Sequence, residues 1–151
     1  MKNLIVSFLL IVPFLFTSCS DDDDGATVEF TTYTLAEVGD SGVSGTATFT
    51  KIDANTTRID LALTGTPADG NHPAHIHLGS VAQAPGAIAI SLTSVDGDTG
   101  LSTTTVTALD DDTTINYEGL IDFDGYINVH LSPDDLATLV AQGNIGSNVT
   151  N

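Results

Sequence analysis

Short segments of alternating apolar and polar residues dominate the chain after residue 26. In Arg58-Ile59-Asp60-Leu61-Ala62-Leu63 an apolar side chain occupies every second position, which is the period of a half-buried β-strand. Similar segments, rich in Thr, Val, Ile and aromatic residues, recur throughout this region. The pattern predicts strands at residues 27–36, 43–52, 57–64, 74–79, 87–95, 102–109 and 126–131.

Turn-forming residues fill the intervals between these segments. Glycine, proline, aspartate and asparagine suit tight turns, because they set or tolerate the backbone angles that turns require. They occur in Gly39–Gly42, Asp53–Asn55, Gly65–Asn71, Ala84–Gly86 and Asp96–Gly100. Regular spacing of short strands and turns predicts an all-β fold, specifically a β-sandwich.

Residues 133–142 depart from this pattern and predict one short helix. Ser132 is a good N-cap, Pro133 suits the first helical position, and Gly143 can end the helix. One face of the helix would carry three apolar residues at helical spacing, namely Leu136, Leu139 and Val140.

The four histidines of the chain lie in or beside two of the predicted strands. His75 and His77 are two residues apart, so their side chains point to one face of a strand, while Ile76 and Leu78 are expected to face the core. His130 shares the polar face of the last predicted strand with Asn128. If the two strands are neighbours, His75, His77 and His130 converge on one exposed site.

Three imidazoles on one strand face suit Cu(II) or Zn(II) by ligand type. The alternative is that the rings link neighbouring strands by hydrogen bonds, one ring nitrogen donating and the other accepting. His72, beside Pro73 in a polar loop, is expected to be such a link. We also expect the helix at residues 133–142 to cover the histidine site as a lid.

The first 18 residues have the pattern of a secretory signal peptide. A short basic start precedes an apolar run at Leu4–Phe16, which is too short to cross a bilayer, and small residues precede Cys19. Cys19 is the only cysteine, so an internal disulfide is excluded. Residues 19–26 contain the self-repelling run Asp21–Asp24 and are expected to form an acidic tether. One domain is expected at residues 27–151.

The chain is strongly acidic. Its 20 Asp and Glu residues stand against three Lys and Arg residues, which gives a formal net charge of −17. Nucleic acid is not an expected partner, because phosphate binding needs clustered basic side chains. Negative charge raises the local concentration of cations. The sequence carries no phosphate loop and no paired-carboxylate motif with supporting context.

Several separated blocks resemble the copper-zinc superoxide dismutase family. They are Gly70-Asn71-His72-Pro73-Ala74-His75-Ile76-His77, Val129-His130, Asp134-Asp135-Leu136 and Gly143-Asn144-Ile145-Gly146-Ser147. This resemblance implies a Greek-key β-sandwich and a copper site. It implies that His75, His77 and His130 are the copper ligands and that His72 supports them. Zinc is the less expected ion.

The same blocks look still more like the CHRD (chordin-type) domain family, especially its short single-domain bacterial lipoproteins. That resemblance covers most of residues 27–148 and includes Ile127–His130 and Ala141–Gly143. Cys19 stands where such lipoproteins carry the acylated cysteine of the lipobox. The resemblance implies an outer membrane lipoprotein, held to the lipid bilayer through Cys19 on the cell surface or the periplasmic face. The CHRD family offers no settled biochemical activity, and a fold alone does not supply one.

The chain departs from the dismutase pattern at three functional points. No histidine lies between His77 and His130, so the bridging histidine and the zinc subsite have no counterpart. The dismutase disulfide is excluded, because Cys19 is the sole cysteine. Asn148 stands where the dismutases carry the arginine that guides superoxide.

The sequence therefore predicts a membrane-anchored, non-catalytic binding module with a three-histidine copper site. The alternative is a copper-only, superoxide dismutase-like redox protein. Metal analysis separates a metal-binding module from a metal-free one, and a superoxide assay tests the redox alternative. The sequence does not identify a protein partner.

Overall fold

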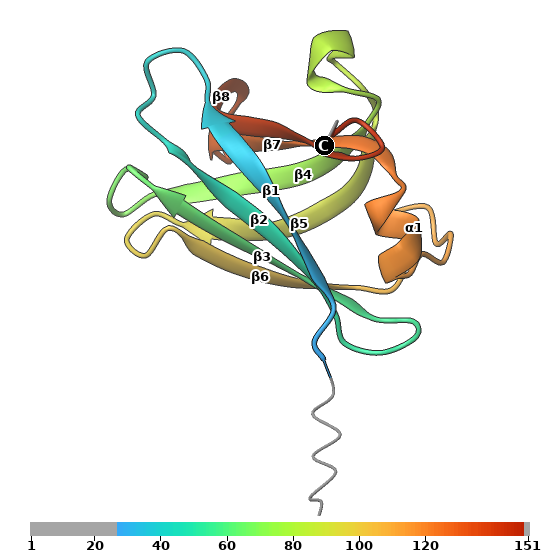
Figure 1. Cartoon of the computed structure of the whole chain (residues 1–151). Coiled ribbons are helices and arrows are strands. Elements are labelled where there is room, and N and C mark those ends of the chain that lie inside the picture. The colour runs from blue at the N-terminus through green and yellow to red at the C-terminus, as the bar shows by residue number, and fades with distance from the viewer. Residues whose placement is uncertain (1–26, 150–151) are drawn as a thin grey trace, which may run out of the picture.

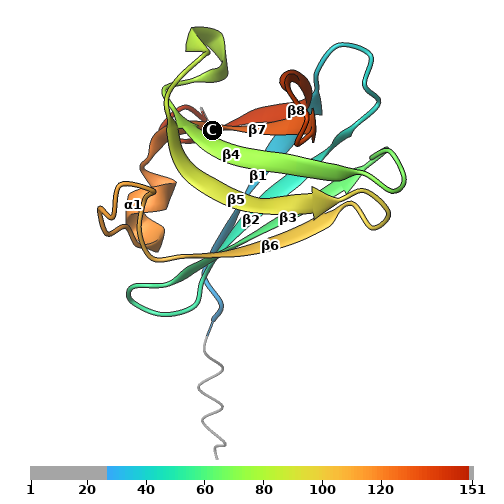
Figure 2. The same ribbon diagram turned by 180° about the vertical axis from the view of Figure 1, so that it is seen from behind.

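Eight antiparallel strands form one continuous, strongly curled sheet in the computed structural model, which describes residues 27–149 (Figures 1 and 2). The order across the sheet is β5-β4-β7-β8-β1-β2-β3-β6. The predicted all-β fold is confirmed. The strands are β1 Phe30–Glu37, β2 Ser44–Lys51, β3 Thr57–Thr64, β4 Asn71–Leu78, β5 Ile88–Asp96, β6 Leu101–Val106, β7 Asp124–Ser132 and β8 Asp135–Gly146.

The curl brings the two edge strands of the sheet together. A short turn joins β5 to β6, and the Thr93 N–H donates a hydrogen bond to Thr104 Oγ1 at 2.8 Å. Around the curled sheet, β4, β5 and β6 are neighbours in chain order, and β7 returns to lie on the other side of β4. This is the Greek-key arrangement that the sequence predicted. The half-sheets β5-β4-β7-β8 and β1-β2-β3-β6 face each other, as Figure 1 shows.

The core lies between the two half-sheets. Leu35, Phe49, Ile76 and Ile127 are fully buried there, and the Tyr33 ring meets the Phe49 ring edge-on with centroids 5.1 Å apart. Successive side chains of a strand point to opposite faces. Burial of Ile76 on β4 and of Ile127 on β7 therefore turns the neighbouring polar side chains of these two strands to the outer face of the sheet.

The helix predicted at residues 133–142 is wrong, because most of these residues belong to β8. Strand β8 pairs with β7 on one side and with Ala36 and Glu37 of β1 on the other. The expected helix start is instead the tight turn between β7 and β8, where Ser132 Oγ accepts a hydrogen bond from the Asp135 N–H at 3.1 Å. Short apolar runs fit either period, and here ladder partners on both edges favour the strand.

Two further expectations, for Gly143 and for Leu78, are wrong. Gly143 does not end a helix; a Cβ atom there would lie 2.2 Å from the carbonyl oxygen of Thr34 on β1. Glycine at this position therefore permits the close approach of β8 to β1. Leu78 was expected in the core but is 48% exposed, because β4 ends there.

A short helix does occur in the described part of the chain, in the connection between β6 and β7. It is α1, Tyr117–Ile121, with Asn116 as its N-cap. The Asn116 Oδ1 accepts a hydrogen bond from the Gly119 N–H at 3.0 Å. Five residues are too few to produce a periodic signal in the sequence.

Candidate metal centre

The two histidine-bearing strands are neighbours in the sheet. β4 pairs with β7, and this register places His75 opposite Asn128 and His77 opposite Tyr126. Side chains of directly opposed residues share one face of an antiparallel pair. The structure thus brings together His75, His77 and His130 on the outer face, and one ligand atom from each lies within 4.8 Å of the others.

The three rings pack closely. His75 Nδ1 lies 3.1 Å from His130 Nε2, and the His75 ring centroid lies 5.0 Å from that of His130 and 5.9 Å from that of His77. The Tyr126 ring stacks on His77 at a centroid distance of 5.1 Å. His77 and His130 are buried and His75 is partly exposed, so the cluster opens to solvent on the His75 side.

Backbone carbonyls fix the tautomers of two of the rings. The Nδ1–H of His77 donates to the carbonyl oxygen of Gly86 at 2.9 Å, and the Nδ1–H of His130 donates to that of Leu136 at 2.7 Å. Each ring then keeps its Nε2 lone pair for the cluster. Such carbonyl contacts orient metal-ligating histidines in general.

Burial favours the neutral form of two of the three imidazoles, those of His75 and His130. Burial lowers the pKa of His75, the nearby His130 and His77 rings lower it further, and the Asp110 carboxylate opposes this. Burial also lowers the pKa of His130, although its hydrogen bond to the Leu136 carbonyl acts in the opposite direction. Neutral imidazole is the form that binds a metal.

The donor set fits a copper or zinc ion. Both ions take imidazole nitrogens readily, and a metal about 2.0–2.1 Å from each nitrogen separates neighbouring nitrogens by about 3.5 Å. The present separations of up to 4.8 Å require a shift of about 1 Å toward the centre. The buried His77 Nε2 has no hydrogen-bond partner within the described residues, which leaves its lone pair available.

His72 lies apart from the cluster. It is fully buried, and its Nδ1–H donates to the carbonyl oxygen of Leu131 at 2.8 Å, with the carbonyl of His130 at 3.3 Å. These contacts tie the start of β4 to the end of β7. His72 therefore acts on the position of His130 through the backbone.

Two residues beside the cluster were not singled out for a role by the sequence. Asn128, opposite His75, is buried, and its Oδ1 has no partner among the described residues. Asp110 reaches the other flank, because Ser91 stands opposite His75 on β5 and binds the Asp110 carboxylate through N–H at 3.0 Å and Oγ at 2.8 Å. The alternation of the last predicted strand places Asn128 on the face of His130 but gives it no role. Asp110 lies in a loop that carries no comparable signal.

The lid predicted at residues 133–142 is not a helix, and the Leu136 side chain is half exposed. The segment reaches the site in another way, since the Leu136 carbonyl accepts the hydrogen bond from His130. The backbone of the β7–β8 hairpin, rather than an apolar stripe, therefore contacts the cluster.

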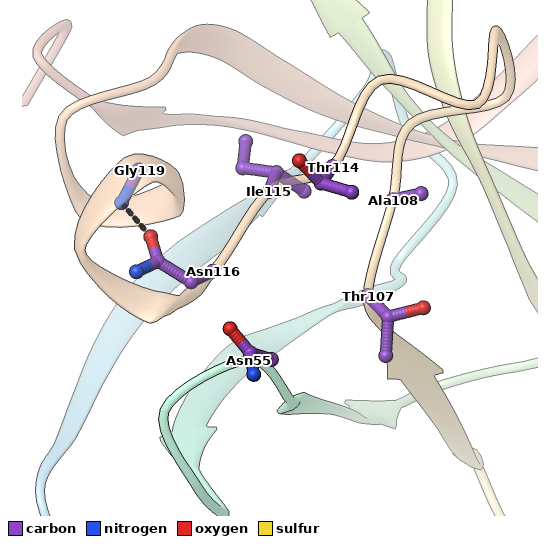
Figure 3. Close-up of a pocket in the computed structure, with 7 residues that line it drawn as sticks. All are labelled: Asn55, Thr107, Ala108, Thr114, Ile115, Asn116 and Gly119. Carbon is purple, nitrogen blue, oxygen red and sulfur yellow. Dashed lines mark hydrogen bonds between the residues drawn. The ribbon is translucent and has the colours of Figure 1, made fainter.

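A separate hollow of about 550 Å³ lies between α1 and the turn that joins β2 to β3 (Figure 3). Its lining residues are Asn55, Thr107, Ala108, Thr114, Ile115, Asn116 and Gly119. None of these carries an acid, a base or a strong metal ligand. The hollow therefore lacks the groups that acid–base or metal chemistry requires.

Cys19, the predicted signal peptide and the acidic tether lie outside the described residues. Within residues 27–149, no helix has the length and apolar character needed to span a membrane.

The comparisons with known proteins are sparse. No protein-family model and no curated protein matches the chain. Among solved structures, the chain is similar to an Asp-to-Asn mutant of superoxide dismutase 5 from Candida albicans, with 18% identity and a TM-score of 0.49 over 81% of this chain and 94% of that chain. A likeness at this level does not establish a metal, a substrate or an activity.

Proposed function

We propose that the domain binds one copper ion through His75 Nδ1, His77 Nε2 and His130 Nε2, as a membrane-anchored binding module rather than an enzyme. The observation that carries this proposal is the His77 Nε2 atom, which is buried without a partner beside the two other ligand atoms. Zinc is the competing ion, since neutral imidazoles also suit Zn(II).

A cation accounts for the cluster better than hydrogen-bonding links do. With both Nδ1–H groups held by carbonyls, His77 and His130 present two lone pairs to the centre, and only His75 can donate to one of them. A buried acceptor without a partner costs about 1–3 kcal/mol. One metal ion would satisfy all three rings, whereas links between strands leave His77 Nε2 unpaired.

The surroundings of the cluster argue against fast superoxide chemistry. Copper would supply one-electron redox chemistry, but an anionic substrate needs positive charge to attract it. The two basic residues of the described chain, Lys51 and Arg58, flank the turn between β2 and β3 and not the histidines. The Asn148 Nδ2 donates to the carbonyl of Gly79 at 2.9 Å and to the Asp124 carboxylate at 2.7 Å, so this amide serves as a structural link.

The anchor proposed for the domain is acylated Cys19 in an outer membrane, on the cell surface or the periplasmic face. The support is the apolar run Leu4–Phe16 ending in small residues before the only cysteine. More than one acyl chain gives a stable anchor, because each buried CH₂ group adds about 0.8 kcal/mol.

Copper titration of the protein without a histidine tag tests the metal proposal. Calorimetry should show one equivalent of Cu(II) bound, and His130→Ala should weaken binding by 100-fold or more. The magnitude follows from about 10–16 kcal/mol for four-ligand zinc sites, or about 3 kcal/mol per ligand. Absence of binding, or binding indifferent to His130→Ala, would overturn the site.

Two controls separate ligation from folding. His72→Ala should lower the melting temperature but leave the copper stoichiometry at one, because His72 bonds only to carbonyls. His130→Gln keeps an N–H donor near the Leu136 carbonyl and should fold while losing copper affinity. Removal of superoxide at a near-diffusion-limited rate by the copper-loaded protein would instead favour the dismutase-like alternative.

A further inference from the structure

Three large apolar side chains are exposed where the described chain begins. Val28 is 66% exposed, Phe30 is 62% exposed and Ile52 is 51% exposed. Val28 and Phe30 lie just before and at the start of β1, and Ile52 follows the last residue of β2. In Figures 1 and 2 the start of β1 and the turn between β2 and β3 lie at the same end of the molecule.

The strand register places these three side chains on one face. Phe30 stands opposite Thr50, and the Lys51 N–H donates to the Glu29 carbonyl at 2.9 Å, which continues the same register. Val28 then falls opposite Ile52, on the face that carries Phe30, because side chains two residues apart share a face. The three residues form one apolar patch, called here the entry patch.

One basic side chain, Arg58, flanks the entry patch. Arg58 stands opposite Thr50 on β3 and so shares the face of Phe30, whereas Lys51 points to the other face, where it pairs with Glu29 and Glu118. Arg58 is paired with Asp60 at 2.7 Å, so the flank carries a positive group without a net positive charge. Apolar side chains bordered by a long basic side chain suit the headgroup region of a bilayer, where that side chain reaches phosphate groups.

The chain outside the structure ends close to the entry patch. Eight residues lie between Cys19 and Val28, and the nine steps of an extended chain from one to the other span at most about 30 Å. A lipid anchor at Cys19 therefore keeps the patch within a short distance of the bilayer surface. By contrast, Figures 1 and 2 place the β7–β8 hairpin, which contacts His130, at the opposite end of the molecule.

We propose that the entry patch of Val28, Phe30 and Ile52 rests on a bilayer surface of zwitterionic phospholipid, with Arg58 at the phosphate level. This inference rests on the proposed acylation of Cys19. Zwitterionic lipid is the expected surface because the chain has a net charge of −17 and anionic lipid would repel it. In this orientation the histidine cluster faces away from the membrane.

The chain contains no tryptophan, so a single introduced indole can report on its own surroundings by fluorescence. Phe30→Trp places one indole in the patch. Leu101→Trp places one at a matched exposed site outside the patch, since Leu101 is 55% exposed. Leu101 is the first residue of β6, whereas Arg58 pairs with Thr105 near the other end of that strand. The chain starting at Cys19 retains every described element, and its single thiol can be coupled to a maleimide lipid in phosphatidylcholine vesicles. Brominated lipids then quench an indole that touches the acyl region.

The expected result is a blue-shifted, strongly quenched emission for Phe30→Trp and an unshifted emission for Leu101→Trp. Adding Ile52→Ser to Phe30→Trp should reduce quenching at least twofold, and vesicles rich in anionic lipid should reduce it as well. Equal quenching of the two reporters, or none of Phe30→Trp in a variant with the wild-type circular dichroism spectrum, would overturn the proposal. Chemical coupling makes this test independent of native acylation, which is judged separately from the acyl mass on Cys19.

Discussion

Acidification should weaken copper binding only below about pH 6.5, the ordinary pKa of histidine. Metal and protons compete for the same nitrogen lone pairs, so affinity falls once the folded protein begins to protonate them. Burial lowers the pKa of both His75 and His130. Their protonation therefore begins at a lower pH than that of a free imidazole, and the affinity should stay flat through neutral pH.

The steepness of the fall follows from the number of rings. Each histidine that must lose a proton reduces the affinity tenfold per pH unit, which corresponds to about 1.4 kcal/mol. The two rings with lowered pKa values contribute up to a hundredfold of this loss per unit once the pH is below both values. The folding stability of the metal-free domain changes with pH in the same direction. As the pH falls, His75 and His130 take up protons in the unfolded chain before they do so in the folded domain. The stability that these two neutral rings contribute is therefore fully present above about pH 6.5 and is lost as the pH falls through their folded pKa values.

Competition with a chelator of known pH dependence measures this effect. Titrations at half-unit steps from pH 8 to pH 5 should give a plateau and then a slope that reaches at least two. A tenfold loss of affinity already between pH 8 and pH 7 would refute the reasoning, because it would require ligands that protonate in the neutral range. His130→Gln should reduce the limiting slope by about one, since one titrating ring is removed.

Three further changes test other parts of the structure. Cys19→Ala should release the protein from membranes into the soluble fraction; continued membrane association, with no acyl mass on the wild-type N-terminus, would contradict the anchor. Gly143→Ala should lower the free energy of unfolding in urea by about 1–3 kcal/mol, because its Cβ would meet the Thr34 carbonyl oxygen; an unchanged midpoint would show that β1 yields freely. Asn128→Leu should leave the metal-free melting temperature equal or higher, since it removes an unpartnered buried acceptor, while changing the electron paramagnetic resonance spectrum of bound Cu(II); an unchanged spectrum would place Asn128 outside the site.

The meeting of the three histidines follows from simple periodicity. His75 and His77 flank the buried Ile76, and His130 follows the buried Val129, so each must lie on an outward face. The pairing of β4 with β7 then places them side by side. Alternation along strands is a local property, and for this reason the sequence predicts it well.

The atoms that tune the site have no such local signal. Gly86 and Leu136 contribute only backbone carbonyls, which every residue possesses, and their positions depend on how the loop before β5 and the start of β8 fold back on the sheet. The error at residues 133–142 has a similar origin. Ser132 and Pro133 suit a helix start and a tight hairpin equally, and the ladder partners of β8 on β7 and on β1 decide between them.

The pairing of β1 with β8 also constrains the order of events during synthesis. Ala36 pairs with Gln142, so the sheet joins residues near the two ends of the domain. Contacts of such large sequence separation form slowly, because the chain must first lose the entropy of a long loop. Until the ribosome has made residues 135–146, β7 lacks one neighbour and His130 lacks the Leu136 carbonyl that orients it. A nascent chain therefore gains its complete histidine cluster only after its last strand has arrived.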